Sequence, residues 1–402
     1  MQILNSEAAF LKIANAQQTY LSQWYLETPA IITSDKYNQL HRVQQLLHRA
    51  IRYFVDHYDA YEHIFPMSDN IRRVVDLCSP FPYRVGTYRP DFLIDEVHQM
   101  KICEIGARFP LNGYFLSGIA EHIGRERYQY ASYFDQPLYK RFLHYLMEYW
   151  AGMKQLYVLK GSDRPCDIKY YIPFFEEMGI KVETLSPNDL DHDSLKKLAG
   201  CYTLNEFNQM EMDVLDDDVL RAIAASNSLN DMRTIFLIHD KRFLAVLSDT
   251  GFLSQFLSPA EASFLRPYLI PTYTSCQAPE LWEEARSNKE EWVIKHALLG
   301  KSEQVYTGRT CTDEEWDKLF EPSVQSSMVL QPFIHQQRIR SSIQGEQYHD
   351  YVVGTMLCFD DHFFGPGLFR TSSFEITNRV DDRKMSPCFT NEYSDYKTYF
   401  IL

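Results

Sequence analysis

The stretch that decides the fold is residues 291–319, EWVIKHALLGKSEQVYTGRTCTDEEWDKL. A short apolar run ends on Lys295, a polar loop centred on Gly300, Lys301 and Ser302 follows, and then comes a second apolar run. Two apolar runs joined by a loop that contains glycine predict a β-hairpin. Such a hairpin can place one lysine and several backbone N–H groups over a phosphate chain.

The same region continues with the start of a helix and a further strand. Thr312 to Glu315 has the spacing of a capping box, in which each end residue bonds to the backbone of the other. The run at 328–334 is apolar apart from Gln331, and Pro332 interrupts strand pairing because it has no N–H. An amide and free backbone groups at such a break can read the edge of an adenine. The alternative is an ordinary hairpin with surface lysines.

A second hairpin is predicted in the first third of the chain. Apolar runs at 92–94 and 101–105 flank a polar turn, so antiparallel pairing brings Asp91 close to Glu104. Neighbouring carboxylates repel each other unless a cation neutralises them, and their oxygens suit Mg²⁺. Arg89, two residues before Asp91, is expected on the same strand face. A surface hairpin with exposed charges is the alternative.

The composition limits which partners the chain can have. A chain of 402 residues is long enough for two or more packed units, and its net charge of −14 argues against a nucleic acid or an anionic membrane. The eight cysteines form no C-x-x-C pair, and the N-terminus lacks the pattern of a signal peptide. No run of about 18 apolar residues is present. We therefore expect a soluble, cytoplasmic protein that acts on small molecules, and a homo-oligomer remains open.

The remaining sequence predicts a mixed α+β or α/β fold in four parts. Residues 1–75 have helical spacing of apolar residues. Residues 76–150 hold the carboxylate hairpin and further helices, and 151–235 follow a strand, helix, strand pattern that predicts a βαβ unit with parallel strands. Residues 236–402 contain the lysine hairpin. The acidic run at 211–218 is interpreted as a solvated helix start rather than a metal site.

The carboxylate hairpin resembles that of circularly permuted ATP-grasp ligases of the glutathionylspermidine synthase-like type. Arg89-x-Asp91 followed by Glu104-x-Gly106 is similar to the Arg-x-Asp and Glu-x-Asn strands of that family. The resemblance implies that Asp91 and Glu104 bind Mg²⁺ and that Arg89 contacts the transferred phosphate. Gly106 replaces the asparagine of the family, which leaves the third ligand position without a side-chain oxygen. Asn112 is a nearby substitute.

The second half of the chain carries matching motifs. Asp240-Lys241 before a helix, a second helix capped by Ser258, and an expected strand at 270–272 resemble the Asp-Lys helix and I-P-x-T strand of the family. Arg370 matches an arginine that points into the phosphate region, with pairing to Glu375 as the structural alternative. The resemblance implies that the nucleotide is bound by Lys241, Lys295, Gln331, Phe333, Gly300, Lys301 and Ser302.

The chemistry that the resemblance implies is ATP-dependent joining of a carboxylic acid to an amine, with ATP and Mg²⁺ as cofactors. A carboxylate attacks the γ-phosphate to give an acyl phosphate and ADP, and an amine then displaces phosphate to form an amide. An amino acid, a peptide or a carrier-bound acyl group are all compatible substrates. The alternative is a catalytically impaired ATP-grasp protein that binds nucleotide or acts as a scaffold, which Gly106 and the glycine-poor 296–303 loop favour. A phosphotransferase is a third interpretation.

Overall fold

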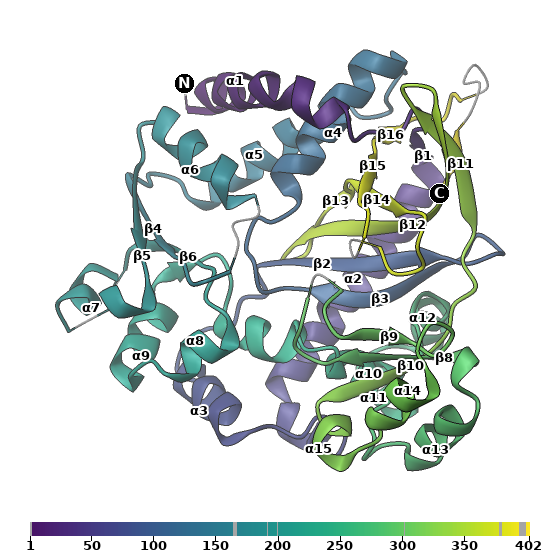
Figure 1. Ribbon diagram of the computed structural model, residues 1–402. Helices are drawn as coiled ribbons and strands as arrows, with labels where there is room; N and C mark the ends of the chain where they lie inside the picture. The colour runs from purple at the N-terminus through teal and green to yellow at the C-terminus, as the bar shows by residue number, and fades with distance from the viewer. Residues whose placement is uncertain are drawn as a thin grey trace.

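Seven strands from two distant parts of the chain form the central sheet (Figure 1). The computed structural model describes residues 2–163, 167–190, 192–198, 200–300, 302–377, 380–393 and 399–402. The central strands are β2 (Thr87–Ile94), β3 (Met100–Gly106), β11 (Arg338–Ile343), β12 (Glu346–Phe359), β13 (His362–Pro366), β14 (Phe369–Ser372) and β15 (Arg383–Met385). Their order is β15-β14-β12-β2-β3, with β11 and β13 also paired to β12. Along β2, Tyr88, Phe92 and Ile94 are buried and alternate with half-exposed residues, so one face packs on helices and the other is free to form a site.

A small antiparallel sheet lies below the central sheet in the view of Figure 1. Its strands are β8 (Trp292–His296), β9 (Val305–Thr307) and β10 (Met328–Pro332), and its helices are α13 (Pro279–Ser287), α14 (Asp313–Lys318) and α15 (Pro322–Gln325). Trp282 and Trp316 are buried in its own hydrophobic core. The predicted hairpin is confirmed, and so is the capping box of Thr312 and Glu315 at the start of α14.

A parallel sheet with the order β5-β4-β6-β7 forms the opposite flank of the molecule (Figure 1). Its elements are β4 (Gln155–Leu159), α6 (Ile168–Glu177), β5 (Lys181–Leu185), α7 (His192–Leu198), β6 (Tyr202–Asn205), α8 (Gln209–Asp213), α9 (Asp217–Ala225) and β7 (Asn227–Ser228). β4 pairs with both β5 and β6 in parallel, which confirms the predicted βαβ unit. The acidic run at 211–218 falls at the end of α8 and the start of α9.

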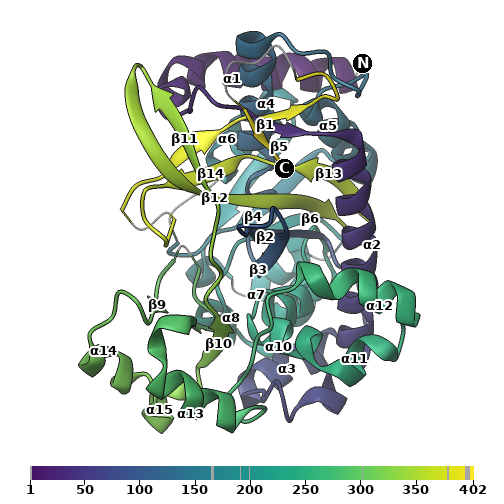
Figure 2. The same ribbon diagram turned by 90° about the vertical axis from the view of Figure 1, so that its right-hand side faces the viewer.

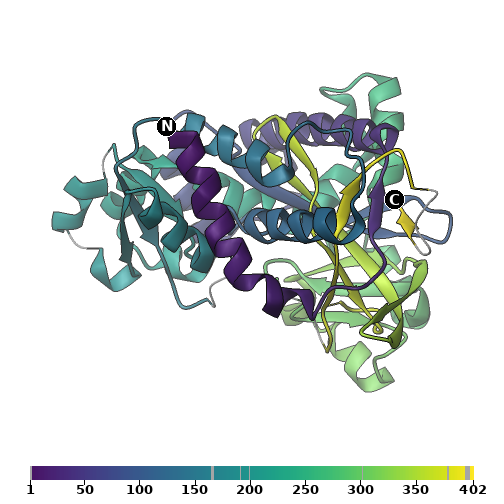
Figure 3. The ribbon, with the colours of Figure 1, turned by 90° about the horizontal axis from the view of Figure 1, so that it is seen from above.

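The N-terminal region is helical, with one strand that the sequence did not predict. Its helices are α1 (Gln2–Ser22), α2 (Ser34–Asp56) and α3 (Asp69–Cys78), and α4 (Tyr114–Tyr128) and α5 (Leu138–Tyr149) follow later in the chain. Figure 3 shows α1 crossing the molecule beside α5, and Figure 2 shows α2 along one side. The unpredicted strand β1 (Ala30–Ile32) pairs with β16 (Pro387–Phe389) and β17 (Phe400–Ile401). The sequence did not predict it because its three residues are all buried and show no alternation of polar and apolar side chains. The four-part division of the chain stays a prediction.

The segment before the small sheet differs from expectation. The helices α10 (Arg242–Ser248), α11 (Thr250–Ser254) and α12 (Pro259–Leu265) form, and Ser258 caps α12 as predicted. The strand expected at 270–272 does not form. Single bridges are present instead, from Leu269 to Ile102 and from Tyr273 to Leu330. These bridges join different sheets, and Pro271 between them has no N–H to extend a ladder. Within the described part of the chain, no helix is both long and apolar enough to cross a membrane.

Candidate functional site

An open cleft separates the central sheet from the small sheet. Its empty space is about 880 Å³ with the open mouth included. The predicted residues that line it are Asp91, Glu104, Lys295, Ser302, Gln331, Phe333 and Arg370. Arg89, Lys241 and Gly300 are not part of this lining, and Lys301 lies outside the described residues. The structure therefore brings together seven predicted residues from four separate segments of the chain.

The two carboxylates lie opposite each other on the floor of the cleft. Asp91 and Glu104 are direct cross-strand partners of β2 and β3, so their side chains share a face and their Cβ atoms are about 5 Å apart. The register shifts immediately after this pair, which re-aims the strand beyond it. The predicted hairpin is thus confirmed.

Each carboxylate has a cation beside it. Arg370 Nη2 donates to Asp91 Oδ2 at 2.5 Å, although the two residues are 279 positions apart. Burial lowers the pKa of Arg370, but the carboxylates of Asp91, Asp382 and Glu104 together outweigh that effect and hold the pKa above its ordinary value. Lys241 Nζ lies 3.6 Å from Glu104 Oε2. The sequence alternative, a pairing of Arg370 with Glu375, is not what the structure shows.

Lys241 also holds the loop that follows β8. Its Nζ donates to the carbonyl of Leu299 at 2.5 Å, and its backbone N–H donates to the carbonyl of Ala297 at 2.9 Å. The lysine is 2% exposed and is the residue directly before α10, three positions after a π-helical turn at Thr234–Ile238. It therefore lies behind Glu104 rather than at the surface of the cleft.

Lys295 is the cation that faces the cleft without a counterion. It sits in the middle strand of the small sheet, paired with Val329 and Val305. Among the residues that the structure describes, its ammonium has no carboxylate within 4.0 Å and no hydrogen-bond acceptor. A half-buried ammonium with no partner is a place for an anion.

The predicted adenine contacts are partly engaged within the protein. Gln331 Nε2 donates to Thr272 Oγ1 at 2.9 Å, so the donor end of this amide ties β10 to the preceding segment. Phe333 carries Arg309 over its ring at 4.1 Å. Ser302 Oγ donates to the carbonyl of Thr377 at 2.6 Å, which attaches the loop to the C-terminal segment across the cleft. The roles of Gln331, Phe333 and Ser302 toward a nucleotide stay predictions.

Gly106 lies where the family places its third metal ligand, and an arginine covers it. A Cβ at this position would be 3.0 Å from Arg89 Nη2. Arg89 Nη1 donates to the backbone carbonyl of Asn112 at 2.7 Å, so Asn112 is used through its main chain. Two facing carboxylates fit Mg²⁺, which in nucleotide sites takes one or two carboxylates together with phosphate oxygens. In the described ranges, no group of three or more His, Cys, Asp and Glu residues could hold a metal.

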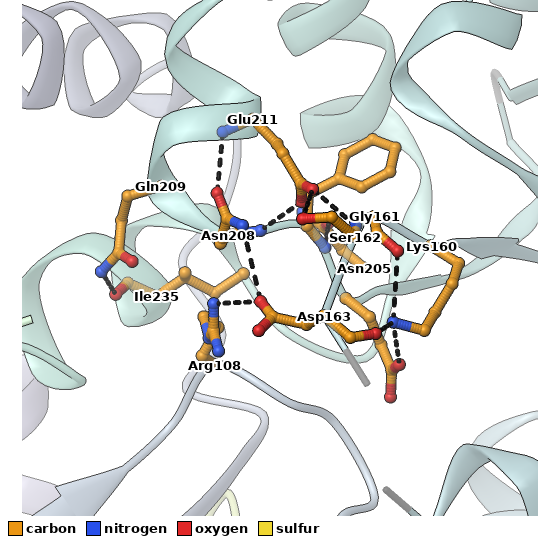
Figure 4. Close-up of polar contacts among 12 residues, drawn as sticks. Arg108, Lys160, Gly161, Ser162, Asp163, Asn205, Asn208, Gln209, Glu211 and Ile235 are labelled. Carbon is orange, nitrogen blue, oxygen red and sulfur yellow. Dashed lines mark hydrogen bonds and ion pairs between the residues drawn. The ribbon is translucent and has the colours of Figure 1, made fainter. Parts of the chain in front are cut away.

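A second polar cluster lies at the carboxyl ends of β4 and β6 (Figure 4). Arg108 Nη1 donates to Asp163 Oδ2 at 2.8 Å, and Asn208 Nδ2 reaches the same oxygen at 3.5 Å. Lys160 Nζ is 3.8 Å from Glu206 Oε2. Sequence reasoning missed this cluster, although polar residues directly after parallel strands are a usable signal, since ligands bind at such edges.

Glu206 is the least satisfied member of that cluster. It is 1% exposed, and in the described structure neither of its carboxylate oxygens accepts a hydrogen bond. Burial raises its pKa to about 7, and Lys160 opposes this. Near the cluster, burial and the charge of Lys241 lower the pKa of His239 to about 3, so this imidazole is neutral. Its Nδ1 accepts from the Ala107 N–H at 3.3 Å.

Comparisons with known proteins bear on the fold. The model of a family described as the AnkG N-terminal domain matches residues 43–237. The ATP-grasp enzyme ankG of Aspergillus thermomutatus is 26% identical over 182 residues, which cover 41% of this chain and only 38% of that protein. The apo structure of a glutathione synthetase-like effector of Globodera pallida aligns with a TM-score of 0.55 and 13% identity over 91% of this chain and 90% of that one. The chain has a glutathione synthetase-like ATP-grasp fold.

The fold predicted from the sequence is therefore confirmed. The comparisons support an ATP-grasp ligase in general terms and name no reaction for this chain.

Proposed function

We propose that the chain is an ATP-dependent ligase that joins a carboxylic acid to an amine through an acyl phosphate. The observation that carries the proposal is the cleft itself. Facing carboxylates Asp91 and Glu104 lie across it from Lys295, a cation without a partner in the described chain. A triphosphate with Mg²⁺ is the ligand class that needs acidic and basic groups side by side.

The residues have distinct roles in this mechanism. Asp91 and Glu104 would hold Mg²⁺, which would supply positive charge to offset that of the nucleotide phosphates. Lys295 binds phosphate oxygens from the small-sheet side, and Lys241 supports the site from behind Glu104. Arg370 binds the phosphoryl group in transfer, because a planar guanidinium matches phosphate oxygens. Arg89 contacts the same phosphoryl group from the side of Gly106.

The loop from 297 to 304 excludes water from the acyl phosphate, which would otherwise hydrolyse. Ser302 attaches this loop to the opposite wall through Thr377. Lys241 anchors its start through Leu299. The cluster around Arg108 and Glu206 binds one of the two small-molecule substrates, since it offers both charges at the end of a parallel sheet.

The test is a turnover assay. Incubation with ATP, Mg²⁺ and pooled amino acids and polyamines should release ADP and phosphate together, with a new amide detected by mass spectrometry. Lys295→Ala should abolish release while the protein remains folded. Lys318→Ala, a charge removal on exposed α14 of the same sheet unit, should leave it unchanged. Full activity of Lys295→Ala would reject the assignment.

One observation favours a second function, that of a nucleotide-binding protein without catalysis. Gly106 supplies no metal ligand, and Arg89 covers it. This alternative predicts that a non-hydrolysable ATP analogue binds but that ATP is not consumed with any pool of acids and amines. ADP release coupled to amide formation would exclude it.

A further inference from the structure

Three side chains form one row across the central sheet. Thr355 of β12 is the direct cross-strand partner of Asp91, and Asp91 is the partner of Glu104. Residues directly opposite in antiparallel strands point to the same face. Val353, two residues before Thr355, lines the cleft, and side chains two apart share a face. The Thr355 side chain is therefore on the same face of the sheet as Asp91, on the side of Asp91 away from Glu104, buried just beside the cleft lining.

This hydroxyl is buried and has no hydrogen-bond partner in the described structure. Thr355 is 8% exposed, and its Oγ1 neither donates nor accepts. Its backbone is satisfied, since its carbonyl accepts from the Gly367 N–H at 2.8 Å. Leaving a buried hydroxyl unpaired is unfavourable, and valine has nearly the same shape without that cost. The hydroxyl is thus not explained by folding.

Arg370, which donates to Asp91, has a second role under the proposed function. Under that function the same guanidinium binds the phosphoryl group in transfer. When Arg370 turns to the phosphate, the Asp91 carboxylate loses this donor. A carboxylate that must hold a metal then needs another donor to fix its orientation.

Other donors near Asp91 are already committed. Arg89 bonds to Asn112 through Nη1, and Lys241 bonds to Leu299 beside Glu104. We propose that Thr355 is a positioning residue whose hydroxyl donates to Asp91 once the metal–nucleotide complex fills the cleft and Arg370 turns to the phosphate. This inference rests on the proposed function and explains why a threonine with an unpaired hydroxyl stands at this point.

The test measures metal binding and stability rather than turnover. Free Mn²⁺ is titrated by electron paramagnetic resonance with the full chain, with and without a non-hydrolysable ATP analogue. With the analogue, Thr355→Val should raise the Kd of Mn²⁺ about five- to tenfold, the loss expected for one hydrogen bond. Thr355→Ser, which keeps the hydroxyl, should bind as the wild type does. Without the analogue, all three proteins should bind Mn²⁺ alike, because Arg370 still holds Asp91.

Stability supplies the second readout. Thr355→Val should have an unchanged or raised thermal midpoint, because it removes an unpaired buried hydroxyl. Equal Mn²⁺ affinity of the Val variant and the wild type with the analogue would overturn the proposal, and so would an equal loss with and without it. A lower midpoint in the Val variant would show a structural hydroxyl and also overturn it. Failure of the wild type to bind the analogue would instead remove the proposed function.

Discussion

Restoring the family asparagine at Gly106 should destabilise the protein. A Cβ there would approach Arg89 Nη2 to 3.0 Å and Cζ to 3.7 Å, so the guanidinium must move for Gly106→Asn to fit. Because the asparagine side chain extends beyond Cβ, we expect the guanidinium to move far enough to lose the bond of Nη1 to the Asn112 carbonyl at 2.7 Å. A hydrogen bond from a charged group contributes roughly 1.5–3 kcal/mol. Replacing a strand glycine recovers about 0.5–1 kcal/mol. We therefore expect a net loss of about 1–2 kcal/mol.

The assay is a double-mutant cycle by chemical denaturation. The free energy of unfolding is measured for Gly106→Asn, Arg89→Ala and the double variant. If displacement of Arg89 causes the loss, Asn should cost nothing in the Arg89→Ala background, with a coupling energy of about 1 kcal/mol or more. The same cost in both backgrounds would refute the reasoning and would assign the effect to the backbone. Gly106→Ala, which adds only the Cβ, should lose less than Gly106→Asn.

Three further predictions concern single residues. Lys295→Met should change the free energy of unfolding by less than about 0.5 kcal/mol, because no described ion pair is lost. It should also raise the Kd of an ATP analogue, measured by calorimetry, about 10- to 100-fold. Equal affinity in Lys295→Met and the Lys318→Met control would contradict this prediction. Lys241→Met should speed hydrogen exchange around Leu299, because the bond that anchors the loop is gone; unchanged exchange would mean that the loop is held otherwise. The folded pKa of Glu206 is raised to about 7, so its favourable contribution is present below its ordinary value, near 4.5, and is lost as pH rises through 7. Glu206→Gln should therefore flatten the stability of the protein between pH 4.5 and 7, as followed by denaturation at several pH values, and a wild-type slope in the variant would count against the raised pKa.

Local sequence patterns were sufficient for the two hairpins. Asp91 and Glu104 pair across a short turn, and Lys295 ends an apolar run before a glycine loop, so neighbours along the chain determine the geometry. The capping box of Thr312 and Glu315 is equally local. The ATP-grasp fold followed from the order of such motifs, each of which is weak alone.

The sequence did not predict contacts between residues that are far apart in the chain. Nothing near Arg370 in the chain indicates that its guanidinium meets Asp91, because the register of β12 against its neighbours decides that contact. Glu206 has no motif, and only its position after a parallel strand marks it. The strand expected at 270–272 does not form for the same reason, since the flanking residues Leu269 and Tyr273 bridge to two different sheets.

The charges around the cleft indicate in which form the nucleotide binds there. Asp91, Glu104 and Glu375 line the cleft with three negative charges, and Arg370 and Lys295 line it with two positive ones. Lys241 behind Glu104 adds a third positive charge, so these groups sum to 3 − 3 = 0, while the whole chain carries −14. Free Mg²⁺ must compete with Arg370 and Lys241 for both carboxylates. Free ATP brings its negatively charged phosphates against those carboxylates, which repel them. An Mg²⁺–triphosphate complex, with a charge of roughly −2, satisfies both sets of groups at once, so metal and nucleotide should each strengthen the binding of the other.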